Sequence, residues 1–138
     1  MFVKIPKIIQ LLYPSITWTK KTSANEIWLT FDDGPDPIAT PWILKTLKEK
    51  EIKATFFLIG KNMQKFPDIV QQILNEGHSI GNHSYSHING WKNKTKNYIN
   101  DINKCQELMA KNTLFRPPYG KITSCQIKKL KKIYNIIL

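Results

Sequence analysis

Arginine is nearly missing from this chain, although basic residues are abundant. Of the 21 basic residues, all but one are lysines, and the exception is Arg116. Acidic residues are also scarce: the chain has only 10 Asp and Glu, and its formal net charge is +11. Such a surplus favours anionic partners, namely nucleic acid, anionic lipid or anionic cell-wall polysaccharide. Solvated helix faces would account for the lysines equally well.

Long apolar runs and paired cysteines are missing as well. No stretch of roughly 18 apolar residues occurs, which excludes a standard transmembrane helix. The two cysteines, Cys105 and Cys125, form no CxxC pair, so we interpret them as isolated thiols, as expected in a reducing compartment. A hydrophobic fraction of 41% excludes a disordered chain.

The first residues combine positive charge with a short apolar run, as signal peptides do. The run Ile8–Leu12 contains Gln10 and leads to no small-x-small cleavage site. We therefore interpret residues 1–24 as a lead-in segment to a single domain over residues 25–138. The lack of a clear signal peptide favours the cytoplasm.

Strand and helix patterns alternate along the rest of the chain, without repeats or low-complexity linkers. Runs rich in β-branched and aromatic residues predict strands at 27–31, 54–59, 79–81, 114–115 and 134–138. Apolar residues at helical spacing predict helices from about 40 to 50, 66 to 76, 95 to 110 and 126 to 133. The unbroken apolar run at 54–59 is typical of a strand buried on both faces. The pattern predicts an α/β domain with a mostly parallel sheet.

Polar clusters follow the predicted strands. These clusters are Asp32-Asp33, His83 with His87, and Arg116 with Tyr119. The carboxyl ends of parallel strands share one face of a β/α fold, and active sites are built there. We therefore expect the three clusters to converge.

Each cluster has both a chemical and a purely structural interpretation. Two imidazoles four residues apart can bind one metal ion, although such a pair is often fortuitous. One aspartate would complete a His₂-Asp site and the other would act as a base, but Asp-Asp-Gly-Pro also forms ordinary turns. Arg116 could orient Asp32 through its guanidinium, or could simply lie in a stiff proline turn. A low G+C coding bias would also explain the scarcity of arginine.

Taken together, the motifs resemble a known family. The segments TFDDGP at 30–35, HSYSH at 83–87 and RPPY at 116–119 resemble the first three motifs of the polysaccharide deacetylases, the NodB-like domains of carbohydrate esterase family 4. The resemblance extends from about Glu26 to the C-terminus. It implies a partial (β/α) barrel with about five parallel strands, helices outside and later strands missing.

The resemblance also implies a chemistry. It implies a divalent metal, usually zinc, and hydrolysis of N-acetyl groups on amino sugars of chitin-like or peptidoglycan glycans, a substrate class that suggests the cell envelope. The expected partner is therefore an N-acetylated glycan, and no nucleic acid is expected. Carried over residue by residue, the metal ligands correspond to Asp33, His83 and His87. The catalytic positions correspond to Asp32 as the base, Arg116 as its orienting partner, and Tyr119, whose backbone N–H would help to hold the oxyanion.

The sequence departs from the family in its last part. The family's fourth motif, an Asp/Trp-containing strand end, and its fifth, a Leu-x-His that supplies the general acid, have no counterpart here. His78 does not match the fifth motif. We therefore expect an incomplete domain whose strand at 134–138 is an unpaired edge. Activity should be lowered by about 10²–10⁴-fold, while metal binding should persist.

Two other hypotheses remain at this level. The chain could be a remnant that binds metal and glycan without catalysis, which the missing general acid favours. It could also be a nucleic-acid-binding protein, although only the positive net charge supports this hypothesis.

Overall fold

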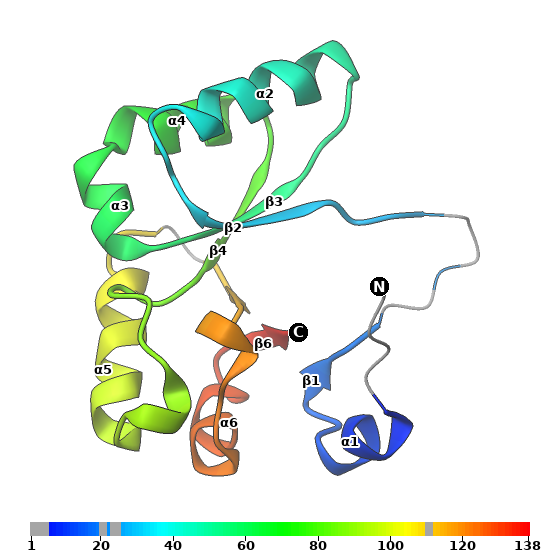
Figure 1. Ribbon diagram of the computed structural model, residues 1–138, viewed down its shortest axis with the longest axis vertical. Helices are drawn as coiled ribbons and strands as arrows, with labels where there is room; N and C mark the ends of the chain where they lie inside the picture. The colour runs from blue at the N-terminus through cyan, green and yellow to red at the C-terminus, as the bar shows by residue number, and fades with distance from the viewer. Residues whose placement is uncertain (1–5, 20–21, 23–25, 110–111) are drawn as a thin grey trace.

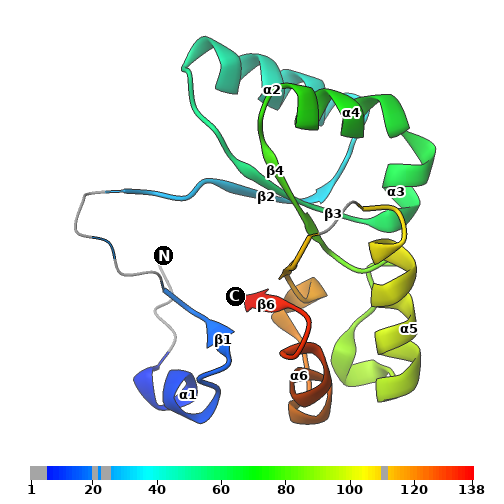
Figure 2. The ribbon, with the colours of Figure 1, turned by 180° about the vertical axis from the view of Figure 1, so that it is seen from behind.

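Six short strands form one open parallel sheet, with helices packed against it (Figures 1 and 2). The computed structural model describes residues 6–19, 22, 26–109 and 112–138. The spatial order of the strands is β1-β6-β5-β4-β3-β2, and every neighbouring pair is parallel. The strands are β1 (Ile16–Thr17), β2 (Thr30–Gly34), β3 (Thr55–Leu58), β4 (Ser79–Asn82), β5 (Leu114–Phe115) and β6 (Asn135–Ile137). This confirms the predicted α/β class and the partial, barrel-like sheet.

The helices fill the connections between strands. They are α1 (Lys7–Leu12), α2 (Ala39–Glu49), α3 (Gly60–Lys65), α4 (Pro67–Asn75), α5 (Thr95–Gln106) and α6 (Ser124–Leu130), with single 3₁₀ turns η1 (Gly90–Lys92) and η2 (Pro118–Gly120). Both views show α2 and α4 side by side along β2–β4, with α5 and α6 beside the other strands. Within the described residues, no helix has the length and apolar character needed to cross a membrane.

Two hydrophobic clusters hold the helices to the sheet. One joins α2, α3 and α4 to β3 through residues such as Leu44, Phe56 and Ile73. The other joins α5 and α6 to β1, β5 and β6. Phe56, Phe57 and Leu58 are all nearly fully buried, so the prediction that this strand is covered on both faces is confirmed. Phe57 points away from the helices, toward the face that carries Arg116.

The prediction of an unpaired edge at 134–138 is wrong. β6 lies between β5 and β1, and Ile136 pairs with both Ile16 and Phe115. The lead-in contains the two-residue strand β1, which pairs with the outer side of β6. The sheet therefore has six strands rather than the expected five or so. The edges of the sheet are β1 and β2. β1 lies in the segment that the sequence analysis interpreted as a lead-in, so it was not predicted.

Several boundaries also differ from the predictions. β2 spans Thr30–Gly34 rather than 27–31. Ile27, Trp28 and Leu29 are exposed, although the Leu29 carbonyl still accepts a hydrogen bond from the Thr55 N–H of β3 at 3.0 Å. The short helix α3 was not predicted. α6 begins at Ser124, where the Thr123 hydroxyl and the Gln126 side chain form a reciprocal capping box. α5 ends at Gln106, and the expected end at 110 lies outside the described residues.

Both cysteines are free, as predicted for isolated thiols. Cys105 is fully buried among apolar side chains, and this burial raises the pKa of its thiol to about 12. Cys105 is therefore a core residue rather than a reactive one.

Candidate metal and catalytic site

A β-bulge explains how two adjacent aspartates can serve one site. Neighbouring residues of a regular strand point to opposite faces. In β2, however, Asp32 pairs with Phe57 and Gly34 with Leu58, so Asp33 is an extra residue between them, and its φ is +70°. The Asn62 side-chain amide donates to the Asp33 carbonyl at 2.8 Å and supports this conformation. Both carboxylates consequently line the same cavity.

The loop after β4 carries the two histidines. His83 follows the last strand residue, Asn82, whose side-chain oxygen accepts a hydrogen bond from the Ser84 N–H at 2.9 Å. Ser84 and His87 both have positive φ, so the chain turns sharply between the imidazoles. The ring centroids of His83 and His87 are therefore only 5.1 Å apart.

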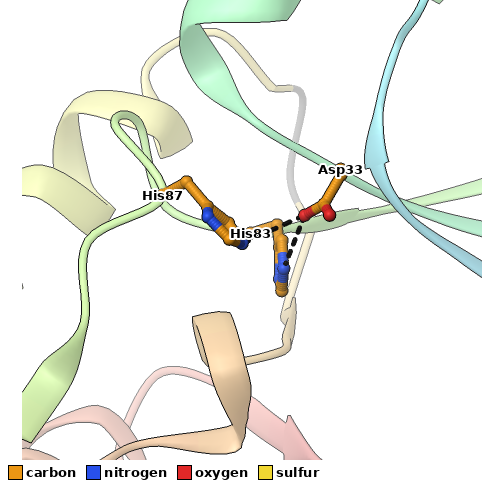
Figure 3. A group of neighbouring side chains, drawn as sticks. All are labelled: Asp33, His83 and His87. Carbon is orange, nitrogen blue, oxygen red and sulfur yellow. Dashed lines mark ion pairs between the residues drawn. The ribbon is translucent and has the colours of Figure 1, made fainter.

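Asp33, His83 and His87 form a compact triad (Figure 3). The Asp33 Oδ1 lies 3.3 Å from the Nε2 of His83 and 3.0 Å from the Nε2 of His87. One ligand atom from each residue lies within 4.8 Å of the other two. The side chain of His83 is 3% exposed and that of Asp33 is 64% exposed, so the triad is buried on the His83 side and open to solvent on the Asp33 side.

The hydrogen bonds of the triad suit a cation. The Nδ1 of His83 lies 2.7 Å from the Arg116 carbonyl, which can only accept, so this nitrogen carries the proton. Burial lowers the pKa of His83 and favours the neutral ring, although nearby Asp32 and Asp33 oppose the shift. The lone pair of Nε2 then faces a carboxylate oxygen, an arrangement that a shared cation satisfies. Two imidazoles and a carboxylate are a ligand set typical of zinc.

Asp32 is held by the single arginine. The Arg116 NH1 donates to Asp32 Oδ1 at 2.9 Å and to the Thr30 hydroxyl at 2.8 Å. The guanidinium also lies 4.2 Å from the centre of the ring of Phe57 on β3, the strand next to β2. Arg116 is thus fixed by three partners, which leaves Asp32 with one preferred orientation.

Tyr119 lies at the edge of the same site, on η2. Its φ is +60° and its side chain is 62% exposed. Its hydroxyl lies 3.2 Å from the Nδ1 of His87, and the two rings are 4.5 Å apart. The sequence pointed to the backbone of Tyr119, and the hydroxyl contact adds a partner for the second nitrogen of His87.

One cavity of about 460 Å³ contains all six predicted site residues, Asp32, Asp33, His83, His87, Arg116 and Tyr119, together with Pro117, Gly120 and Leu138. Among the described residues other than glycine, five have positive φ, and four of these are Asp33, Ser84, His87 and Tyr119. Backbone strain of this kind concentrates at functional sites.

Sequence reasoning missed the residues that support the site. Thr30 and Phe57 fix Arg116, Asn62 holds the bulge, and Asp101 binds the histidine loop. Each acts on a residue far away in sequence, so spacing alone gave no signal. The FDDGP segment did contain one clue, since Asp is among the residues other than glycine that most readily adopt the positive φ found at Asp33.

Comparison with known proteins identifies the family. A family model described as polysaccharide deacetylase matches residues 19–134. The chain belongs to the polysaccharide deacetylase family. It is 51% identical over 108 residues to a peptidoglycan-N-acetylglucosamine deacetylase of Bacillus cereus, a match that covers 75% of this chain and 39% of the relative. A second protein of that name from the same organism is 42% identical over 128 residues, which cover 89% of this chain and 60% of the relative.

A solved structure confirms the fold of the family. The crystal structure of the Bc1960 peptidoglycan N-acetylglucosamine deacetylase, in complex with 4-naphthalen-1-yl-N-oxidanyl-benzamide, superposes with a TM-score of 0.86 at 41% identity. The match covers 93% of this chain and 63% of that one. This chain thus spans between about two fifths and three fifths of the length of these relatives.

Proposed function

We propose that this chain is the metal-binding part of an N-deacetylase that hydrolyses N-acetyl groups on amino sugars of peptidoglycan or chitin-like glycans. The observation that carries the proposal is that two adjacent aspartates in one cavity have different partners. Asp33 faces two imidazoles, whereas Asp32 faces Arg116. The names of the relatives favour peptidoglycan as the substrate.

The triad residues would hold a divalent cation, and we propose Zn²⁺. A bound cation of this kind acts as a Lewis acid toward a carbonyl oxygen and increases the acidity of water. The site fits such an ion because His83 and His87 each have one nitrogen engaged by a protein oxygen, which leaves the other directed at Asp33.

Asp32 would act as the general base. Its carboxylate would accept a proton from the water that attacks the acetyl carbonyl. Arg116 would keep Asp32 off the ion and oriented toward that water, since its NH1 bonds Asp32 and Thr30 simultaneously. The backbone N–H of Tyr119, at the rim of the cavity, would donate to the oxyanion of the tetrahedral intermediate.

A metal- and glycan-binding remnant without turnover is the second candidate. The departing amine must be protonated, and an imidazole usually does this. The chain has three histidines, of which two are in the triad, and His78 packs at the other end of β4. No described residue therefore offers this cavity a third imidazole.

An acetate-release assay separates the two candidates. The chain is incubated with Zn²⁺ and a tetramer of N-acetylglucosamine, and zinc binding is measured in parallel by calorimetry. We expect zinc binding and slow acetate release that Asp32→Asn abolishes without loss of zinc. The exposed Asp68 on α4 offers a matched control, and Asp68→Asn should change neither. Zinc binding without turnover would favour the remnant, and failure to bind zinc would contradict both candidates.

A further inference from the structure

The backbone of the loop between the two triad histidines forms hydrogen bonds with two helices, α3 and α5. At the amino end of α3, the N–H of Gly60 donates to the carbonyl of Ser84, and the N–H of Lys61 donates to that of Tyr85, each at 3.0 Å. These bonds satisfy two of the carbonyl groups of the loop. The loop amides, which point the other way, need acceptors of their own.

Asp101, in the middle of α5, supplies the acceptor. Its Oδ2 accepts from the Tyr85 N–H at 2.9 Å and from the Ser86 N–H at 3.0 Å. Bonds from amides to a carboxylate are stronger than those between neutral groups. The Tyr85 N–H also lies 3.2 Å from the Asp101 carbonyl, whereas no other acceptor for the Ser86 N–H is recorded among the described residues.

The Tyr85 side chain is fixed independently of this carboxylate. Its hydroxyl donates to Gln64 Oε1 at 2.6 Å, and the Lys104 ammonium lies 3.8 Å from its ring centroid. A Cβ at Gly60 would come within 2.6 Å of the ring, so the ring packs directly against the α3 backbone. Loss of the Asp101 carboxylate should therefore leave Tyr85 in place and release mainly Ser86, the residue before His87.

We infer that Asp101 is a positioning residue of the metal site. By holding the amides between His83 and His87, it sets the relative position of the two imidazoles and strengthens the binding of a divalent cation by the triad. The inference rests on the proposed function in so far as the triad binds a metal. Asp101 itself lies on α5, outside the residues that line the cavity.

Zinc titration of four proteins tests this role. Asp101→Ala should raise the dissociation constant for Zn²⁺ by about 10–100-fold, the usual cost of losing an outer partner of a metal ligand. Asp101→Asn should bind zinc with intermediate affinity, because its side-chain oxygen can still accept while its charge is gone. Glu107→Ala removes the same charge from an exposed position at the end of the same helix and should match the unaltered chain.

Amide hydrogen exchange in the metal-free protein provides a second readout. In Asp101→Ala, the Ser86 amide should exchange much faster, and the Tyr85 amide should change less because it retains the Asp101 carbonyl. Unaltered zinc affinity in Asp101→Ala, or an equal loss in Glu107→Ala, would overturn the inference. So would unchanged protection of Ser86.

Two further outcomes are distinguishable. If Asp101→Ala does not fold, Asp101→Asn decides: weaker zinc binding with faster Ser86 exchange supports the role, and unaltered values on both reject it. If the unaltered chain binds no zinc, the proposed function and the effect on affinity both fail. The exchange measurement would still decide whether Asp101 holds the loop, because it requires no metal.

Discussion

The two ends of β4 each carry a buried histidine, and the backbone holds the two rings in opposite tautomers. His78 directly precedes the strand and His83 directly follows it. Their exposed fractions are similar, at 6% and 3%. The Nδ1 of His78 accepts a hydrogen bond from the Ala54 N–H at 3.2 Å, whereas the Nδ1 of His83 donates to the Arg116 carbonyl at 2.7 Å.

This difference decides what each ring can do. In neutral His78 the proton must reside on Nε2, which therefore has no lone pair for a metal. In neutral His83 the proton resides on Nδ1, and Nε2 is available to the triad. Burial and residue type therefore do not distinguish a histidine whose Nε2 could bind a metal from one whose Nε2 could not. The direction of one backbone hydrogen bond does.

The strongest test of this comparison is the removal of the ring at the carboxyl end. His83→Ala should weaken zinc binding by more than about 100-fold, because losing a ligand exceeds the cost of losing an outer partner. Calorimetric titration with Zn²⁺ measures the change. His78→Ala is the matched substitution and should leave zinc affinity unaltered. Retention of full zinc affinity by His83→Ala would contradict the assigned triad.

Arg116 contacts both sides of the site: its carbonyl accepts a hydrogen bond from His83, and its guanidinium donates one to Asp32. Arg116→Lys should therefore lower acetate release by about 100-fold, since a misoriented catalytic group can cost that much. Zinc affinity should stay the same, because the carbonyl that binds His83 is retained. A parallel loss of zinc affinity would show that the two functions are not separable in this way.

His78, at the amino end of β4, should contribute to stability rather than to zinc binding. His78→Ala leaves the buried Ala54 N–H without its acceptor, which should lower the free energy of unfolding by about 1–3 kcal/mol. Urea denaturation of the metal-free protein measures this loss. Ser79→Ala, at an exposed neighbouring position, is the control and should have little effect. An unchanged unfolding midpoint for His78→Ala would exclude a structural role for this ring.

The smallest expected effect is a pH dependence shared by both rings. Burial is the main cause that lowers the pKa of His78 and of His83 below the ordinary 6.5. The unfolded chain then binds more protons than the folded chain just below pH 6.5. The stability of the metal-free protein should therefore be complete above pH 6.5 and should decrease as the pH falls through the lowered values.

Urea denaturation between pH 8 and about 5.5, above the range where most carboxylates titrate, measures this slope. His78→Ala should flatten the slope without abolishing it, because His83 still contributes. A profile that is flat in the unaltered chain would contradict neutral burial of both rings.

The sequence predicted the convergence of the six candidate residues more closely than the outline of the sheet. Asp32, His83 and Arg116 lie at or just after the carboxyl ends of strands, and these strand ends meet in a parallel sheet, so their convergence could be expected. β1 was not expected, because no motif marks it in the lead-in segment and its partner strand lies more than a hundred residues away. The wrong prediction of an unpaired edge has the same origin. Asp101 was missed because a single acid on a basic helix looks like a surface residue.

Because of the bulge in β2, the two aspartates that face one cavity are encoded by adjacent codons. A regular strand would need its two cavity-facing acids to be two codons apart, with an intervening residue free to vary. Here they are neighbours, and Asp33 is both a member of the triad and the inserted residue that breaks the alternation. Deleting its codon would therefore differ from replacing it. Asp33→Ala would leave Asp32 beside Arg116, whereas the deletion would also remove the irregular step between Asp32 and Gly34.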